Sequence, residues 1–269
     1  MPNHYLQTLV ASIALLPSAA LAADSNLFEG TFANTEEVYF DHEANRPAAP
    51  WKSLRLHMEN DALLIENIDA YGKAKGAPVQ AKLSTDKNMQ LLDDGQCKQY
   101  FRTENDGLVA DHKVGDCASS VRISAVTPFA MTLELADGRV TQLRRSRPVS
   151  CWVAILKDKP KADGGEDWHF QNNVRLHDQG GRAAIGGGDT GAQPVVIRMR
   201  NVTWDVGSTN NPVVSLYIHK PDNLERAVSY SWAAPDSARV GVNLRWVQTG
   251  CTIETLDEPS ALTVDKFRG

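Results

Sequence analysis

The residues best suited to chemistry gather in one short segment, between positions 177 and 182. It reads His177-Asp178-Gln179-Gly180-Gly181-Arg182 and is the densest polar cluster of the chain. Two further imidazoles, His169 and His219, lie before and after it, and three histidines can bind zinc where a fold brings them together. The spacing does not require such a meeting, so we predict no metal site. The segment supplies three candidate contacts for a polar ligand: His177, Asp178 and Arg182.

Three motifs of known enzymes occur, and each lacks the context that its chemistry needs. Asp189-Thr190-Gly191 matches the aspartic proteases, but their mechanism requires two carboxylates that share a proton. Gly186–Gly191 has the G-x-G-x-x-G spacing, but Gln193-Pro194 and a strand follow where a helix must begin to hold a pyrophosphate. Ser84–Lys87 fits S-x-x-K without its companion motifs and predicts a loop. We therefore predict no catalytic residue.

All four cysteines lie beyond residue 90, and an even number favours disulfides in an oxidising compartment. Four cysteines allow three pairings. We expect Cys97–Cys117 and Cys151–Cys251, because each bridge then stays within one proposed domain. The chain-entropy model assigns them roughly 3 and roughly 5 kcal/mol, the longer loop giving the larger value. The sequence contains no C-x-x-C, so structural bridges are favoured over metal or redox sites.

The first 22 residues have the features of an export signal. Thr8–Leu16 is largely apolar, Pro17 ends the run, and Ala20-Leu21-Ala22 is a small-x-small cleavage site. The run is shorter than the ~20 residues of a membrane span, and no cysteine follows the cleavage site as in a lipoprotein. No Lys or Arg precedes the run, and a buried N-terminal helix is the alternative. We predict a periplasmic or secreted protein without a membrane span.

The overall charge argues against a nucleic-acid partner. The formal net charge is -5 and the isoelectric point is near 5.8, whereas phosphate binding needs a basic face. Three arginines, Arg144, Arg145 and Arg147, cluster before Pro148. We interpret this short basic run as a solvated connector instead of an anion site.

The first half of the chain alternates short apolar runs with polar turns. Its clearest unit is Leu91–Cys117, a ribbon closed by cysteines with a hairpin turn at Asn105-Asp106-Gly107. Residues 54–58 have a period of two, and no stretch keeps a helical period over three turns. Asn34–Glu37 can instead begin a short helix with acidic residues in its first turn. We expect six to eight antiparallel strands closed into a barrel.

The second half shows a cleaner alternation. Apolar residues recur at every second position within 195–199, 214–218, 228–232 and 240–246. Four such strands form a sheet with one apolar face, which needs the first domain or a further sheet as its partner layer. We predict a signal peptide at 1–22, a barrel domain at 23–149, a β-sheet domain at 150–255 and a flexible tail at 256–269.

Short motifs within residues 27–145 carry a family resemblance. Gly30–Val38 reads GTFANTEEV, Trp51 begins the next strand, and Gly95-Gln96-Cys97 precedes Val114-Gly115-Asp116-Cys117. This pattern resembles the CpcT/CpeT phycobiliprotein lyases, whose motif Gly-x-Phe-Ser-Asn-x-x-Gln is followed by a Gly-Cys and a Gly-x-x-Cys around a hairpin. The resemblance implies a lipocalin-like barrel whose relatives carry a bilin and help attach it to a cysteine of a phycobiliprotein.

The chain departs from this family pattern at several positions. The family's Gln falls on Glu37, each Gly-to-Cys spacing has one intervening residue, and the family's Tyr-Arg pair has no clear match because Gly72 follows Tyr71. Export would also separate the protein from cytoplasmic phycobiliproteins. We add Asn34, Glu37, Tyr39 and Tyr71 as further candidate ligand contacts.

These observations lead to one hypothesis and two alternatives. The hypothesis is an exported all-β protein whose lipocalin-like, antiparallel N-terminal barrel binds an apolar or amphipathic small molecule, without catalysis and without a cofactor. The first alternative is a bilin lyase-like enzyme, for which a linear tetrapyrrole would be the ligand. The second is a structural or protein-interaction module of the cell envelope.

Overall fold

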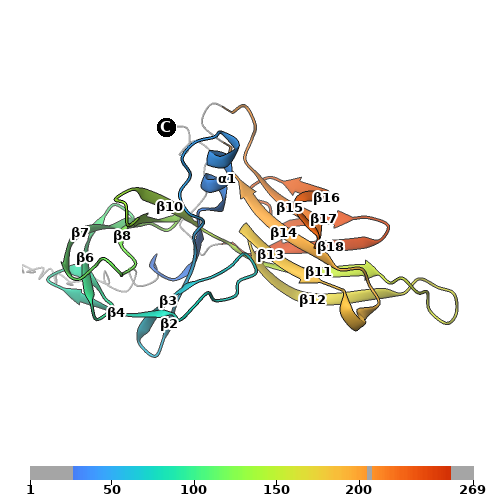
Figure 1. Cartoon of the computed structure of the whole chain (residues 1–269), viewed down its shortest axis with the longest axis horizontal. Helices are drawn as coiled ribbons and strands as arrows, with labels where there is room; N and C mark the ends of the chain where they lie inside the picture. The colour runs from blue at the N-terminus through green and yellow to red at the C-terminus, as the bar shows by residue number, and fades with distance from the viewer. Residues whose placement is uncertain (1–26, 205–207, 256–269) are drawn as a thin grey trace, which may run out of the picture.

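The computed structural model describes residues 27–204 and 208–255, which form a closed β-barrel followed by a β-sandwich (Figure 1). The prediction of an all-β protein is confirmed. The predicted signal peptide and the predicted tail lie outside the described residues. No helix in the described ranges has the length and apolar character needed to cross a membrane.

Ten antiparallel strands close the barrel in the order β1-β10-β9-β8-β7-β6-β5-β4-β3-β2. Their bounds are β1 (Gly30–Ala33), β2 (Ser53–Glu59), β3 (Ala62–Asn67), β4 (Val79–Asp86), β5 (Met89–Asp93), β6 (Cys97–Glu104), β7 (Gly107–Gly115), β8 (Ile123–Val126), β9 (Ala130–Glu134) and β10 (Val140–Arg145). Consecutive strands pair with each other all along the order, and the pairing of β1 with β10 closes the ring.

The barrel has more strands than we expected because residues 79–93 form the hairpin of β4 and β5. Lys87 and Asn88 make the turn with φ values of 49° and 67°, the left-handed region that a two-residue hairpin turn requires. Ser84–Asp86 therefore ends a strand, and the prediction of a loop for the S-x-x-K motif is wrong for these three residues.

The inward side chains of the barrel form one continuous apolar core. Alternate residues of a strand point to opposite faces, so every second residue enters the interior. Phe28 and Phe101 meet there edge to face, with ring centroids 5.6 Å apart. The largest fully buried side chains of this core are Phe28, Phe32, Leu54, Leu56, Leu63, Leu92, Phe101, Leu108, Ile123, Met131 and Leu143. The protein's own side chains thus occupy the interior.

The ribbon predicted at Leu91–Cys117 is confirmed. Strands β6 and β7 pair along their lengths, and Asn105 makes the turn with a φ of 54°. The predicted disulfide Cys97–Cys117 joins their open end, with its Cα atoms 4.8 Å apart. Gly115 allows this closure, because a Cβ at that position would lie 2.2 Å from the carbonyl oxygen of Gln96.

Helix α1 (Thr35–Glu43) follows β1 directly, so the helical alternative for this segment is the right one. Asn34 precedes the helix but makes no side-chain cap. Its amide instead donates to the carbonyl oxygen of Pro50 and to Thr141 Oγ1, and its Oδ1 accepts from the N–H of Lys52. Asn34 therefore fixes the start of α1 to the barrel.

Two four-stranded sheets form the sandwich, with the orders β12-β11-β18-β17 and β13-β14-β15-β16. Their bounds are β11 (Pro148–Leu156), β12 (Trp168–His177), β13 (Gln179–Ile185), β14 (Val195–Val202), β15 (Val213–Lys220), β16 (Asn223–Ala233), β17 (Arg239–Asn243) and β18 (Val247–Ile253). The partner layer is thus a further sheet. The expected strand 240–246 ends at Asn243, and its remainder turns the chain into β18.

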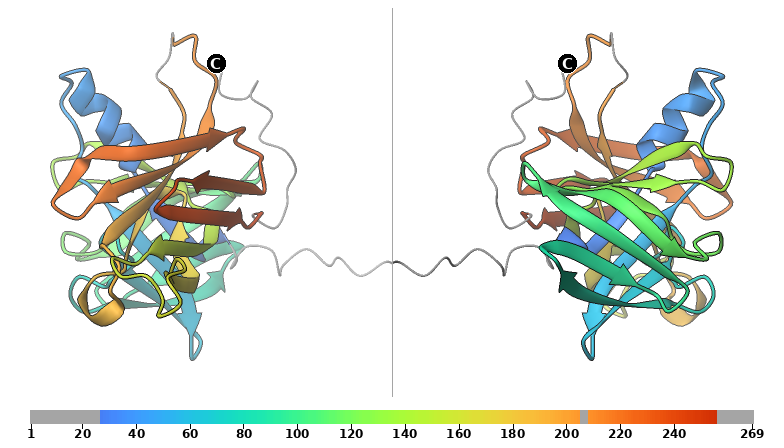
Figure 2. Two further views of the ribbon diagram at one scale, coloured as in Figure 1. Left: turned by 90° about the vertical axis from the view of Figure 1, so that its right-hand side faces the viewer. Right: turned by 90° about the vertical axis from the view of Figure 1, so that its left-hand side faces the viewer.

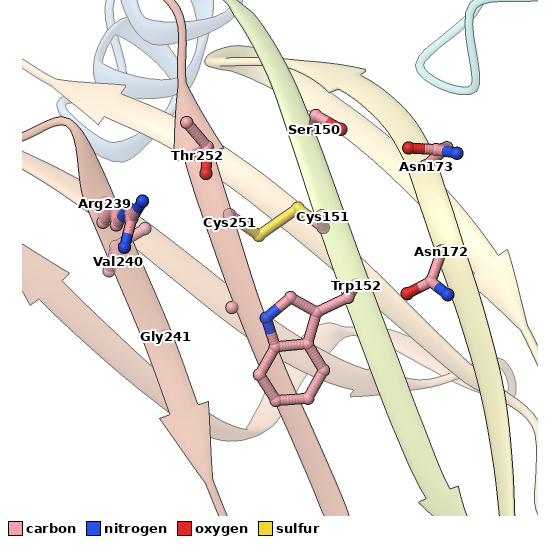
Figure 3. A pocket seen from close by; sticks show the side chains of 11 residues that line it. Ser150, Cys151, Trp152, Asn172, Asn173, Arg239, Val240, Gly241, Cys251 and Thr252 are labelled. Atoms are coloured by element: carbon pink, nitrogen blue, oxygen red, sulfur yellow. A yellow bond between two sulfur atoms is a disulfide. The ribbon is translucent and has the colours of Figure 1, made fainter.

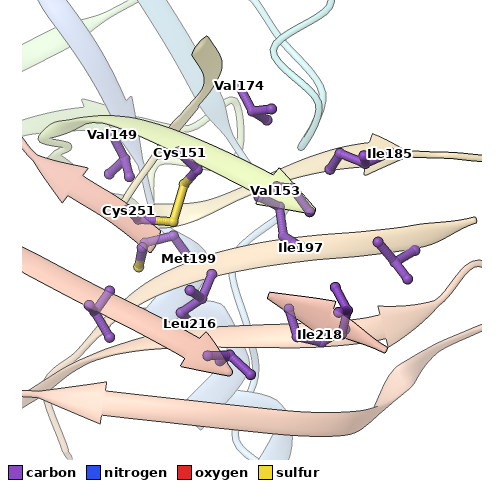
Figure 4. Packing of buried hydrophobic residues seen from close by; sticks show 14 of the residues in the cluster. Val149, Cys151, Val153, Val174, Ile185, Ile197, Met199, Leu216, Ile218 and Cys251 are labelled. Carbon is purple, nitrogen blue, oxygen red and sulfur yellow. A yellow bond between two sulfur atoms is a disulfide. The ribbon is translucent and has the colours of Figure 1, made fainter. Parts of the chain in front are cut away.

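The core of the sandwich is aliphatic and contains the second disulfide (Figure 4). Cys151 and Cys251 lie opposite each other on β11 and β18, with Cα atoms 4.0 Å apart, which confirms the predicted pairing. Val153, Ile197 and Leu216 are fully buried around it. Two disulfides fit folding in an oxidising compartment.

Helix α1 stands where the barrel meets the sandwich, beside β13 and β14 (Figures 1 and 2). The Glu36 carboxylate accepts two hydrogen bonds from Arg200, at 2.8 and 2.7 Å, and both side chains are more than 90% buried. Thr35 Oγ1 donates to the carbonyl oxygen of Gln179 at 2.9 Å. A buried charge pair and a hydrogen bond therefore join the two bodies through this helix.

The basic run at the junction is partly buried, so the prediction of a solvated connector is wrong. Arg145 lies over the Phe32 ring at 4.5 Å, and burial lowers its pKa to about 10. Arg147 Nε donates to the buried Asp178 carboxylate at 2.7 Å. These arginines anchor the start of the sandwich to the end of the barrel.

Candidate functional site

Strand β16 carries its bulky apolar side chains on the outer face of the sandwich. Val228, Tyr230 and Trp232 are 45%, 63% and 65% exposed. Ser229 and Ser231 occupy the other side of the strand, opposite buried apolar residues of β15. The alternation within 228–232 predicted a strand correctly, but the apolar positions face away from the core.

A groove of about 490 Å³ runs between α1 and the outer face of β14, β15 and β16. Polar groups come from Arg200, Ser215, Asn210 and Asn211. Ligand pockets commonly combine apolar walls with a few polar groups that fix the orientation of the ligand. The aromatic residues of the groove are Tyr39, Phe40, Trp204, Tyr217, Tyr230 and Trp232.

Arg200 forms the charged floor of the groove, and its charge is already compensated. Burial alone would lower its pKa, but the hydrogen bonds and charge of Glu36 outweigh this effect and raise it. The guanidinium also lies 4.2 Å from the centre of the Tyr39 ring, a cation–π contact that fixes this ring. Glu36 therefore compensates the charge of Arg200, and the cation–π contact orders the Tyr39 ring beside it.

Ring contacts hold the walls of the groove in place. Tyr217 and Tyr230 face each other across β15 and β16, with ring centroids 5.8 Å apart. Phe40 of α1 meets Trp204 at 5.8 Å, and the Trp204 indole N–H donates to the carbonyl oxygen of Asn211 at 2.9 Å. The rings are thus positioned before any ligand arrives.

No protein-family model, curated protein or solved structure matches this chain. The case for a functional site therefore rests on geometry. Exposed aromatic side chains that adjoin one another cost free energy in water, and such patches mark interaction sites in folded proteins. The groove also lies between α1 and the sandwich, and pockets form preferentially where two structural units meet.

Two of the predicted contacts, Asn34 and Glu37, lie at the junction of α1 with the barrel. Asn34 is fully buried and makes the structural hydrogen bonds described above. Glu37 accepts from Thr141 Oγ1 and from the N–H of Gln142, both at 3.3 Å. Desolvation of its carboxylate outweighs these bonds and raises its pKa. Neither residue lines the groove.

The two candidate tyrosines lie in different places. Tyr39 lines the groove and contacts Arg200. Tyr71 lies in the loop between β3 and β4, where its side chain is 38% exposed. This loop contacts the sandwich where the N–H of Arg182 donates to the carbonyl oxygen of Ala70.

The cluster predicted at 177–182 is a structural junction. Asp178 is fully buried, accepts from Arg147 and Asn201, and lines a cavity of about 270 Å³ between barrel and sandwich. Burial lowers the pKa of His177 to about 4, and neither of its ring nitrogens has a hydrogen-bond partner among the described residues. Arg182 is half-buried on β13. None of the three lines the aromatic groove.

The groove is equipped for binding and lacks the groups of common hydrolases. Its lining within the described residues includes no carboxylate, histidine or cysteine. The described residues also contain no cluster of three or more His, Cys, Asp or Glu that could hold a metal ion.

Sequence reasoning missed most of the groove. Along β16, Tyr230 and Trp232 alternate with Ser229 and Ser231. The two serines lie on the core side, opposite Ile218 and Leu216 of β15. The alternation predicts the strand but not which of its two faces meets the core. The contribution of α1 to the groove could not be predicted from the sequence, because Arg200 and Glu36 are 164 residues apart in the chain.

Proposed function

We propose that this protein binds a saccharide without transforming it, and that the aromatic groove is its binding site. The two disulfides support an oxidising environment, and with the predicted export signal they support a periplasmic or secreted location. The proposal keeps the hypothesis of an amphipathic ligand but moves the site from the barrel interior to the sandwich.

The observation that carries this proposal is the exposure of Tyr230 and Trp232, at 63% and 65%, beside the ordered rings of Tyr217 and Trp204. Large aromatic side chains gain free energy when they are buried, roughly 25 cal/mol per Å² of apolar surface removed from water. Their exposure is therefore a cost in the free protein that a bound ligand removes.

A saccharide fits both the aromatic rings and the polar groups of the groove. A pyranose ring presents C–H groups on its faces, which pack on aromatic rings, and hydroxyl groups on its rim, which need donors and acceptors. The amides of Asn210 and Asn211 and the hydroxyl of Ser215 offer these partners beside the rings. The compensated charge of Arg200 favours a neutral sugar.

The packed barrel interior supports a scaffolding role. Its core residues are nearly all less than 6% exposed, and none of them lines the groove or the junction cavity. A bilin lyase activity stays a prediction from the family resemblance, and no feature of the groove favours it. A protein partner at the aromatic surface is the competing outcome of the test below.

Calorimetric titration of the full mature chain with cellohexaose, mannohexaose and chitohexaose tests the proposal. We expect one of these probes to bind, and we expect Trp232→Ala to weaken its Kd at least about tenfold, a loss of about 1.4 kcal/mol. Trp51→Ala is the matched control, because Trp51 is 53% exposed and stacks on His42 outside the groove.

Two results would overturn the proposal. One is the absence of heat with all three probes. The other is an equal loss of affinity in Trp232→Ala and Trp51→Ala, which would place the saccharide elsewhere on the surface. Because Trp232 is an exposed residue of an edge strand, its substitution leaves the fold intact, and circular dichroism verifies this.

A further inference from the structure

The outer face of the other sheet, β12-β11-β18-β17, is also hollowed, with a volume of about 630 Å³ (Figure 3). Trp152 of β11 lies at its centre and is 44% exposed. The side chains around it are polar: Ser150, Asn172, Asn173, Arg239 and Thr252. This hollow shares no residue with the aromatic groove, and the sandwich core separates the two faces.

A β-bulge places two amides beside the tryptophan. Cys151 pairs with Val174 and Val153 pairs with Gln171, so two residues of β12 lie opposite Trp152 alone. These two residues are Asn172 and Asn173, and Asn173 has a φ of 55°. Bulges often redirect side chains at functional sites, and a left-handed conformation of a residue other than glycine costs free energy. Both amides thus lie on the β12 side of Trp152, while its ring extends toward β18 (Figure 3).

A glycine on the neighbouring strand makes room for the indole. A Cβ at Gly250 of β18 would lie 2.6 Å from Nε1 of Trp152 and 3.0 Å from Cε2. Trp152 and Gly250 are direct cross-strand partners, so the ring can lie flat over the glycine. The ring therefore lies against the sheet and presents its outer side to the hollow (Figure 3).

Several polar groups around the ring have no partner among the described residues. Across residues 27–204 and 208–255, the side chains of Asn172, Asn173 and Arg239 make no hydrogen bond or ion pair, and the indole N–H of Trp152 makes none. Two amides supply donors and acceptors, and the guanidinium supplies donors in a fixed fork. A ligand with several hydroxyl groups can form hydrogen bonds with both the amides and the guanidinium.

We propose that this hollow is a second saccharide-binding site, in which one pyranose ring stacks on Trp152 while Asn172, Asn173 and Arg239 bind its hydroxyl groups. A single aromatic face of this width accommodates one sugar ring, whereas the row of rings in the groove accommodates several. The protein then has two sites on opposite faces of one rigid sandwich, so it can bridge two saccharide chains and gain avidity on a polysaccharide surface. The site stands independently of the groove, because it shares none of its residues.

The test measures stoichiometry and affinity with the same three hexasaccharides on the full mature chain. We expect two sites in the native protein and one site in Trp152→Ala. Trp232→Ala should weaken binding at the groove at least about tenfold and leave the second site unchanged. Protection of Trp152 from oxidation by N-bromosuccinimide, read by peptide mass mapping, reports occupancy of the second site directly.

Two gentler variants keep the test valid if Trp152→Ala disturbs β11. Asn173→Gly removes the amide but retains the left-handed backbone, which glycine adopts freely. Gly250→Ala displaces the indole through the short contact described above. We expect each to weaken the second site at least about threefold and to leave the first unchanged.

The outcomes separate the two sites. A stoichiometry of one that survives in Trp152→Ala, with Trp152 oxidised equally with and without sugar, overturns the second site and leaves the groove intact. A single site that disappears in Trp152→Ala but survives in Trp232→Ala supports the second site and overturns the groove. Protection of Trp152 by a protein partner alone, and by none of the sugars, would also contradict this proposal.

Discussion

The barrel and the sandwich are built from the same kind of antiparallel strand, but they differ in where they place their aromatic rings. The barrel turns Phe28, Phe32 and Phe101 into its interior, where they are fully buried. The sandwich fills its core with aliphatic side chains and carries Trp152 and Trp232 on the outer faces of its two sheets. This contrast is the basis of our proposal that the sandwich binds the ligand while the barrel supports the fold.

The two bodies also differ in how the disulfides hold them. Cys97–Cys117 closes a separation of 20 residues within one barrel hairpin, whereas Cys151–Cys251 closes 100 residues and joins the two ends of the sandwich chain. On the chain-entropy model the longer loop gives the larger stabilisation. The sandwich is therefore expected to depend more on its disulfide than the barrel does.

The largest expected effect is the loss of the sandwich disulfide. Cys151→Ser with Cys251→Ser should lower the free energy of unfolding by about 5 kcal/mol, and Cys97→Ser with Cys117→Ser by about 3 kcal/mol. Urea unfolding followed by intrinsic fluorescence measures both. If removal of the barrel disulfide lowers the free energy of unfolding more than removal of the sandwich disulfide, the sandwich does not depend on its bridge as we predict.

The next effect concerns the contact between the bodies. Glu36→Gln should destabilise the protein by about 3 kcal/mol, because it leaves the buried Arg200 guanidinium without its counter-charge. It should also weaken saccharide binding, because α1 forms one wall of the groove. Glu66→Gln is the control, because Glu66 pairs with the exposed Arg55, and surface pairs contribute about 0 to 1 kcal/mol. Similar losses of stability and of saccharide affinity in Glu36→Gln and Glu66→Gln would contradict the role of α1 as a wall of the groove.

The smallest expected effect is a pH dependence confined to the sandwich. The pKa of His177 is about 4 in the folded protein, below the value of about 6.5 in an unfolded chain. The unfolded state therefore binds the proton first as the pH falls below 6.5, and the folded state loses stability down to pH 4. Between pH 7.5 and 5 this loss is about 2 kcal/mol. His177→Leu should remove this part of the slope, and parallel pH profiles of the two proteins would contradict the prediction.

The local features of the fold follow from the sequence, and the long-range ones do not. Asn105-Asp106-Gly107 predicts the β6–β7 hairpin because these residues favour a positive φ. The β4–β5 hairpin escaped prediction because Lys87-Asn88 makes the same turn without a glycine. Alternation predicted β16 as a strand, but a period of two cannot tell which face meets the core.

The candidate site could be predicted even less well, because distant segments assemble it. Tyr39 was named as a candidate contact from the sequence, and the structure places it in the groove. Its partner Arg200 lies on β14, far along the chain, and only the folded pairing with Glu36 brings the two together. Asp178 and His177 drew attention as a polar cluster, yet burial at the junction assigns them to structure.

One NMR experiment tests most directly whether ligand binds the sandwich surface instead of the barrel interior. The chain has six tryptophans, whose indole N–H signals report on their surroundings, and the methyl group of the fully buried Met131 reports on the barrel interior. With the hexasaccharide that binds, we predict that the Trp204 and Trp232 signals shift while Met131 stays in place. A shift of Met131 with Trp204 and Trp232 unmoved would contradict the account.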